Sequence, residues 1–155
     1  MRPAWTTRFA NNGDVDEVAR LLHDFNTEFD TPSPGPTVLA SRLRVLLDGA
    51  DTVAILAGVP AVALALITLR TNVWYDGKVA LLDELYVVPE LRGQGIGSSV
   101  IGALMTIARD RGVDLIEINV DEGDVDAQRF YERHGFVVIE PGSSERAFYY
   151  SQEVR

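Results

Sequence analysis

A glycine-rich turn is the part of the sequence best suited to binding a ligand. It reads Arg92-Gly93-Gln94-Gly95-Ile96-Gly97-Ser98, follows an apolar run that stops at Pro89, and opens into a long helical pattern. Glycines let a ligand approach the backbone closely, and the first amides of a helix have no partner inside it. With the positive end of the helix dipole, these amides are suited to a phosphate or pyrophosphate.

Spacing excludes two common phosphate-binding motifs at this turn. A Rossmann fingerprint would need a glycine at Ser98 or Val100, depending on which glycine begins it. A Walker loop would need a lysine after Gly97, where the sequence has Ser98-Ser99. The pattern that fits is Arg/Gln-x-x-Gly-x-Gly, preceded by the run Leu85-Tyr86-Val87-Val88-Pro89.

A second patterned segment extends from Asp124 to Phe136 and reads Asp-Val-Asp-Ala-Gln-Arg-Phe-Tyr-Glu-Arg-His-Gly-Phe. It resembles the Asn-x-x-Ala-x-x-Phe-Tyr-x-x-x-Gly-Phe segment of the GCN5-related N-acetyltransferase (GNAT) superfamily. The glycine turn likewise resembles the acyl-CoA-binding motif of that superfamily. Both segments are expected to belong to one N-acetyltransferase domain that covers residues 1–155.

The resemblance implies acetyl-CoA as co-substrate, and a sequence without cysteine and with only two histidines, His23 and His134, predicts no metal. It assigns the backbone of Leu85, Tyr86 and Val87 to the pantetheine arm, which would enter a wedge between two splayed strands. It assigns the turn to the pyrophosphate, through Arg92, Gly93, Gln94, Gly95, Ile96, Gly97 and Ser98. Asp124 stands where the family usually has Asn, so it can still cap the helix but lacks the amide donor, which leaves a direct CoA contact open.

Two residues are the candidates for proton transfer. Tyr131 matches the family tyrosine near the thioester sulfur, where a phenol could protonate the departing thiolate; the alternative is a buried tyrosine that only packs. Glu84, on the strand before the turn, could deprotonate the incoming ammonium through water; the alternative is a structural or solvent-facing carboxylate. Members that acetylate protein amino termini often have Glu where this sequence has Asn119, which weakens that choice of substrate.

Periodicity places these residues on a mixed, mostly antiparallel sheet of about seven strands flanked by about four helices, an α/β fold. Helical spacing is found after Asp14, after Pro36, after Gly95 and after Asp124. Strands are expected at residues 6–10, 52–57, 61–69, 79–88, 113–120, 137–140 and 146–151. The order strand, helix, strand around the glycine turn predicts parallel pairing of the two strands there. The resemblance implies that the loop between the first two helices forms one wall of the acceptor site. His23, Glu28 and Asp30 lie on the approach to this loop and are interpreted as solvated polar residues.

Composition narrows the chemistry further. The 155 residues contain no cysteine, which excludes disulfides, thiolate catalysis and a covalent cysteine intermediate. A net charge of −9 disfavours nonspecific binding to nucleic acid or an acidic membrane, and the absence of a long apolar run indicates a cytoplasmic protein.

The predicted function is acetyl transfer to a primary amine of a small cationic molecule, such as an aminoglycoside, polyamine or amino-acid derivative. The alternatives are a non-catalytic acyl-CoA sensor and a protein lysine or amino-terminal acetyltransferase. The aromatic run near the C-terminus leaves a homodimer open.

Overall fold

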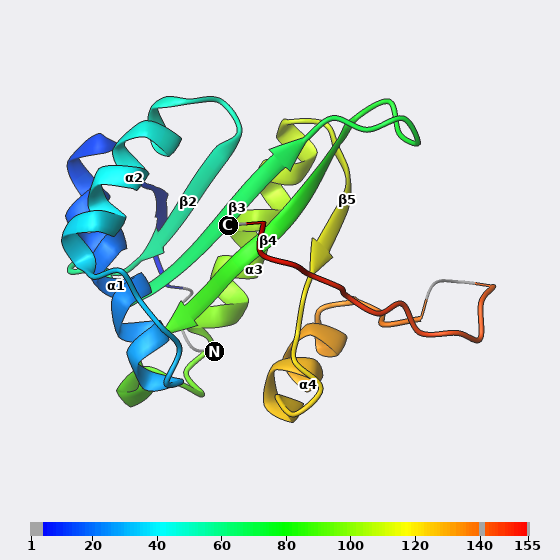
Figure 1. The fold of residues 1–155 in the computed structure, drawn as a ribbon. Helices are drawn as coiled ribbons and strands as arrows, with labels where there is room; N and C mark the ends of the chain where they lie inside the picture. The colour runs from blue at the N-terminus through cyan, green and yellow to red at the C-terminus, as the bar shows by residue number, and fades with distance from the viewer. Residues whose placement is uncertain (1–4, 140–141, 155) are drawn as a thin grey trace. The chain divides into compact units, whose positions relative to one another are not determined.

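The computed structural model describes residues 5–139 and 142–154, and the chain divides after Ile118 into two compact units. The first unit contains five strands and three α-helices, and the second contains one described helix (Figure 1). In chain order the elements are β1 (Thr7–Phe9), a 3-10 turn (Asn12–Asp14), α1 (Val15–Glu28), α2 (Pro36–Asp48), β2 (Thr52–Ala57), β3 (Ala63–Arg70), β4 (Lys78–Val87), a 3-10 turn (Pro89–Leu91), α3 (Ile96–Asp110), β5 (Val113–Ile118) and α4 (Val125–Arg133).

The five strands lie side by side in the order β1-β2-β3-β4-β5. Neighbouring strands from β1 to β4 are antiparallel, and β4 pairs with β5 in parallel through the α3 crossover, which confirms the pairing predicted around the glycine turn. The mixed, mostly antiparallel α/β sheet is therefore confirmed.

Helices cover both faces of this sheet. One face packs against α1 and α2 through a buried apolar cluster that includes Val18, Leu21, Leu43, Leu56 and Leu64. The other face packs against α3, whose buried side chains recur at helical spacing: Ile96, Val100, Ile101, Leu104, Ile107 and Ala108. Burying these two apolar faces against one sheet is what holds the first unit together.

The prediction of about seven strands was wrong, because the described part of the chain forms five. The two extra strands were expected at 137–140 and 146–151, and the described residues of both ranges are not in strands; Glu140 itself lies outside the described part. Alternating apolar residues form a strand only where a neighbouring strand or a core accepts them. Here the side chains Val137, Phe148, Tyr149 and Tyr150 are 70% exposed or more.

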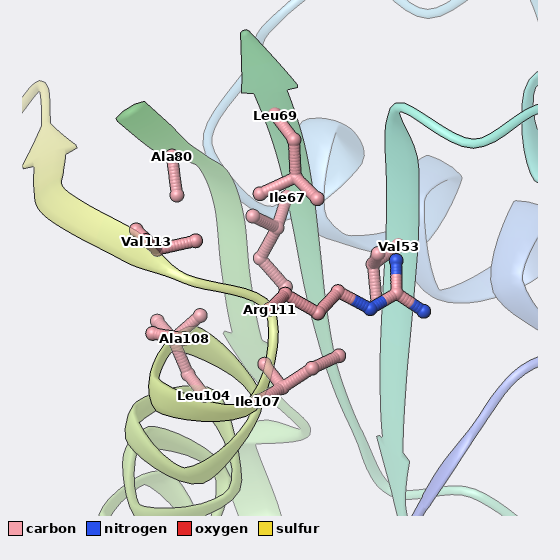
Figure 2. Close-up of a pocket in the computed structure, with 9 residues that line it drawn as sticks. All are labelled: Val53, Ile67, Leu69, Ala80, Leu104, Ile107, Ala108, Arg111 and Val113. Carbon is pink, nitrogen blue, oxygen red and sulfur yellow. The ribbon is translucent and has the colours of Figure 1, made fainter. Parts of the chain in front are cut away.

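A small apolar cavity of about 10 Å³ lies between the sheet and the C-terminal end of α3. Figure 2 shows the Arg111 side chain extending across its lining, which includes Val53, Ile67 and Leu104. A volume this small could hold at most about one water, and apolar walls offer such a water no partner. The cavity is therefore a packing defect, far along α3 from the glycine turn. Within the described residues, no helix is long and apolar enough to cross a membrane.

Candidate active site

Strands β4 and β5 separate halfway along β4. Their parallel pairing ends at Leu82 and Ile118, and β5 stops there, so among the described residues the second half of β4 has no neighbouring strand on that edge. Figure 1 shows the two arrowheads diverging at their carboxyl ends. The pairing of β3 with β4 shifts register at the same point: Ile67 lies opposite Leu82 but Leu66 lies opposite Glu84. Asp83 is thus the extra residue of a β-bulge.

The unpaired edge of β4 presents backbone groups of Leu85 and Val87. The amide of Val88 donates to the Val62 carbonyl oxygen at 2.9 Å, so Val88 faces the β3 side. Backbone groups alternate along a strand, so Tyr86 also turns its N–H and C=O toward β3, while Leu85 and Val87 turn theirs to the open edge. A ligand arm laid along this edge would find donors and acceptors there as if it were an added strand.

The glycine turn joins this edge to the N-terminus of α3. Gly93 and Gly95 have φ of +77° and +82°, conformations that favour glycine, and Gly95 is the N-cap of α3. A Cβ at either glycine would meet no atom within 4 Å, so the backbone lies open to a ligand. The first α-helical bond of α3 is Ser99 N–H to the Gly95 carbonyl oxygen at 3.1 Å. The amides of Ile96 and Gly97 therefore have no acceptor within the helix, as an anion site requires.

Arg92, the first residue of the motif, makes three kinds of contact. Its Nε donates to the Val87 carbonyl oxygen at 3.0 Å, on the open edge of β4. Its Nη1 and Nη2 donate to the two carboxylate oxygens of Glu28, at 2.7 and 2.8 Å. Its guanidinium carbon lies 5.7 Å from the centre of the Tyr86 ring, within range of a cation–π interaction. The motif arginine thus joins α1, the edge strand and an aromatic side chain.

Glu84 lies on the α1 and α2 face of the sheet. It pairs across the strands with Leu66, which packs against the cluster beneath those helices, and residues directly opposite share a face. Burial raises the pKa of this half-buried carboxyl above its ordinary value, and the neighbouring charge of Asp83 raises it further. The Asp83 side chain instead accepts a hydrogen bond from Thr68 Oγ1 at 2.5 Å. A partly buried carboxyl with a raised pKa is a stronger base than an exposed one, which suits it to accepting a proton.

Tyr86 lies on the same face, two residues further along. Its ring stacks on Phe25 of α1 with centroids 5.1 Å apart, and its side chain is 5% exposed. The pKa of its phenol is raised by burial and then by the negative charges of Glu28, Asp24 and Glu90, with Arg92 acting in the opposite direction. Three carboxylates and one guanidinium therefore act on one hydroxyl, which makes its surroundings net negative.

The remaining two site candidates lie on α4, in the second unit. Asp124 is the N-cap of that helix and its Oδ1 accepts from the Ala127 amide at 3.0 Å, which confirms the predicted cap. Tyr131 packs edge-on against Phe130 and Phe136, with centroids 5.2 and 5.8 Å apart. Its contribution to catalysis stays a prediction, as does any CoA contact of Asp124.

Among the described residues of the first unit, the structure gathers Glu84, Leu85, Tyr86, Val87 and the glycine turn at one end of β4. It adds Glu28 of α1, which sequence reasoning treated as an ordinary solvated residue and whose side chain is only 25% exposed. Glu28 and Arg92 are 64 positions apart, so no local pattern signals their pairing.

Known proteins share both the sequence and the fold. Residues 16–136 match the family described as the acetyltransferase (GNAT) family. The chain is 31% identical over 141 residues to an aminoalkylphosphonate N-acetyltransferase of Salmonella typhimurium, covering 86% of each protein. It is 28% identical to a thialysine N-epsilon-acetyltransferase of Bos taurus, covering 83% of this chain and 81% of that protein. Matches can also be local: a 59-residue segment, 37% identical to an uncharacterised N-acetyltransferase of Methanocaldococcus jannaschii, spans 26% of that protein.

A solved structure supports the same assignment. A protein of Arthrobacter sp. FB24, provisionally described as an acetyltransferase, is 51% identical and superposes with a TM-score of 0.91 over 96% of each chain. Family match, relatives and fold agree with the glycine turn and the diverging strands. The chain belongs to the GNAT acetyltransferase family.

Proposed function

We propose that this protein transfers the acetyl group of acetyl-CoA directly to a primary amine of a small cationic molecule. The observation that carries the proposal is the half-buried Glu84, placed where the open edge of β4 begins, on the strand that leads into the glycine turn at the N-terminus of α3. Family members use acetyl-CoA, and among the described residues no group of three metal-ligating side chains occurs. The geometry is compatible with the cofactor: an edge for the pantetheine arm and an amide-lined turn for the pyrophosphate.

The residues divide the work of binding and proton transfer. Acetyl-CoA, when bound, supplies an activated acetyl thioester. The Val87 amide on the open edge would donate to the acetyl carbonyl oxygen and stabilise the negative charge that develops there. Glu84 would accept a proton from the ammonium of the acceptor, directly or through one water, and Tyr131 would donate its hydroxyl proton to the departing thiolate. The proton that Tyr131 loses would be regained from solvent after release of the products.

Charge on the acceptor side favours a cationic amine. Glu28 is paired with Arg92, but two other carboxylates, Asp24 and Glu90, also act on the Tyr86 phenol, on the face where Glu84 lies. A negative surface attracts an ammonium and repels an acidic acceptor. The thialysine enzyme is named for an amine-bearing amino acid, whereas the aminoalkylphosphonate enzyme is named for a zwitterionic amine, so a panel must include both classes.

The test is release of free CoA thiol from acetyl-CoA against a panel of aminoglycosides, polyamines, amino-acid derivatives, aminoalkylphosphonates and short peptides. Wild type and Tyr131→Phe are compared at each acceptor. Turnover with a cationic class that falls at least about 10²-fold in the variant supports the proposal. Turnover confined to peptides would reassign the acceptor to proteins. No turnover together with tight CoA binding by calorimetry would support a non-catalytic sensor instead.

A further inference from the structure

The ion pair between Glu28 and Arg92 links the two halves of the proposed site. Glu28 is the last residue of α1, on the acceptor side, and Arg92 begins the glycine turn, on the cofactor side. Arg92 Nη1 donates to Glu28 Oε2 and Nη2 donates to Oε1, a fork geometry that fixes orientation as well as distance. An exposed ion pair with a single contact would contribute little to stability, but this pair is bidentate and the Glu28 side chain is largely covered.

On the cofactor side, Arg92 holds the turn to the strand. Its Nε bonds the Val87 carbonyl oxygen, and its backbone amide bonds the Pro89 carbonyl oxygen at 3.3 Å. With Glu28 engaging the other two nitrogens, the guanidinium has one orientation, and the residue that leads into Gly93 is fixed. A turn held in its binding conformation loses less entropy when the pyrophosphate binds.

On the acceptor side, the end of α1 determines where the following loop lies. The Asn26 side chain donates to the Pro32 carbonyl oxygen at 2.9 Å, and His23 Nδ1 lies 2.8 Å from Ser33 Oγ. The Thr31 amide also bonds the Asn26 carbonyl oxygen at 2.8 Å. Helix α1 has no basic residue in its own last turn, so Arg92 supplies the positive charge that a helix C-terminus favours. A displacement of Arg92 would thus shift the C-terminal end of α1 and, through these hydrogen bonds, the loop that follows it.

We propose that Glu28 is a positioning residue that couples the cofactor turn to the acceptor loop through Arg92, so that CoA binding orders the loop at residues 29–35. This inference rests on the proposed function for the location of the two substrates. It predicts that CoA and the acceptor favour each other's binding, because each stabilises one end of the same ion pair. It also predicts that Glu28 acts through Arg92 and never on the acceptor alone.

The probe for the test is CoA itself, so no acceptor is needed. Hydrogen exchange of the Phe29, Asp30 and Thr31 amides, which all bond back to α1, is measured with and without saturating CoA. Wild type should show exchange slowed by about fivefold or more on CoA binding. Glu28→Gln, which keeps the size but removes the charge, should lose this slowing and raise the Kd for CoA about fivefold or more.

A matched control separates coupling from general stability. Asp16→Asn also replaces a carboxylate of α1 that pairs with an arginine, Arg44 at 3.5 Å, but that pair does not touch the turn. This variant should keep the CoA-induced slowing and the CoA affinity of wild type. The double variant Glu28→Gln with Arg92→Lys should be no worse than Arg92→Lys alone, because both changes break one link.

Several outcomes would overturn the inference while leaving the acetyltransferase function intact. These are wild type binding CoA without slower exchange at residues 29–31, Glu28→Gln keeping the slowing despite a lower melting temperature, and Glu28→Gln binding CoA more tightly. Tighter binding would mean that Glu28 acts only as a negative charge near an anion site. Failure of wild type to bind CoA at all would instead overturn the proposed function.

Discussion

Replacing Glu84 with glutamine should separate activity from stability. If Glu84 takes the proton from the acceptor ammonium, kcat/KM should fall by roughly 10²- to 10⁴-fold, the usual contribution of a positioned general base. The side chain keeps its size, so packing against Leu66 and its neighbours is preserved. The loss should therefore appear in thiol release at every pH between about 6 and 9.

The same Glu84→Gln change that lowers activity should raise the stability of the folded protein at pH 7. Burial and Asp83 raise the pKa of Glu84 above 4.5, so the folded state binds a proton at Glu84 more tightly than the unfolded state does. The stability that this contributes is complete below pH 4.5 and is lost as pH rises through the raised pKa. Each unit by which the pKa of Glu84 differs between the folded and unfolded states corresponds to about 1.4 kcal/mol of this stability. Glutamine cannot ionise and avoids that loss. Glu84→Gln should melt at a higher temperature than wild type at pH 7, and at about the same temperature at pH 4.

The neighbouring carboxylate provides the control. Asp83→Asn removes the negative charge that helps to raise the pKa of Glu84, so the acid limb of the pH–rate profile should move to lower pH with little change in the plateau. The hydrogen bond from Thr68 can persist with an amide oxygen. Wild-type turnover by Glu84→Gln, together with a melting temperature below that of wild type at pH 7, would refute a buried ionised base. Glu84 would then be a structural carboxylate.

Two further predictions concern the other catalytic candidate and the β3–β4 turn. Tyr131→Phe should lower kcat at least about 10²-fold while the Kd for CoA measured by calorimetry stays within about twofold, and a matching fall in affinity would show that the phenol binds and does not donate a proton. Gly77→Ala should destabilise the protein by about 1–3 kcal/mol in urea unfolding, because the new Cβ would overlap the carbonyl oxygen of Gly112, whereas Gly102→Ala in the open middle of α3 should stabilise it by about 0.5–1 kcal/mol. Equal effects of the two glycine changes would contradict this account.

Local pattern predicted most of the first unit. Helical spacing after Pro36 and after Gly95 predicted α2 and α3, and the expected strands at 52–57 and 113–120 match β2 and β5 to within two residues. These elements bury one face or both, so the sequence alternation and the tertiary environment agree. The parallel pairing of β4 with β5 followed from the order of the elements alone.

The residues near the C-terminus show a similar alternation of apolar and polar side chains, but those that the structure describes do not form strands. Val137 and Tyr150 belong to runs with good strand propensity, yet both are exposed and neither is in a strand. Strand propensity reflects how well a side chain packs against a neighbouring strand, and the local sequence does not show whether such a neighbour is present. The pairing of Glu28 with Arg92 was equally out of reach, since it depends on where α1 ends relative to a turn 64 residues away.

The bulge at Asp83 shows how one extra residue decides on which face of the sheet a side chain lies. Leu82 lies opposite Ile67, which lines the α3 face, so strict alternation would place Glu84 beneath α3 as well. The extra residue reverses the alternation, and Glu84 and Tyr86 turn instead toward α1 and its carboxylates. The same bulge lies where β5 leaves β4, so among the described residues the backbone beyond it has no neighbouring strand on one edge, while the side chains of Glu84 and Tyr86 face α1. Under the proposed function, one strand would thus present its backbone to the cofactor and the Glu84 carboxyl to the acceptor.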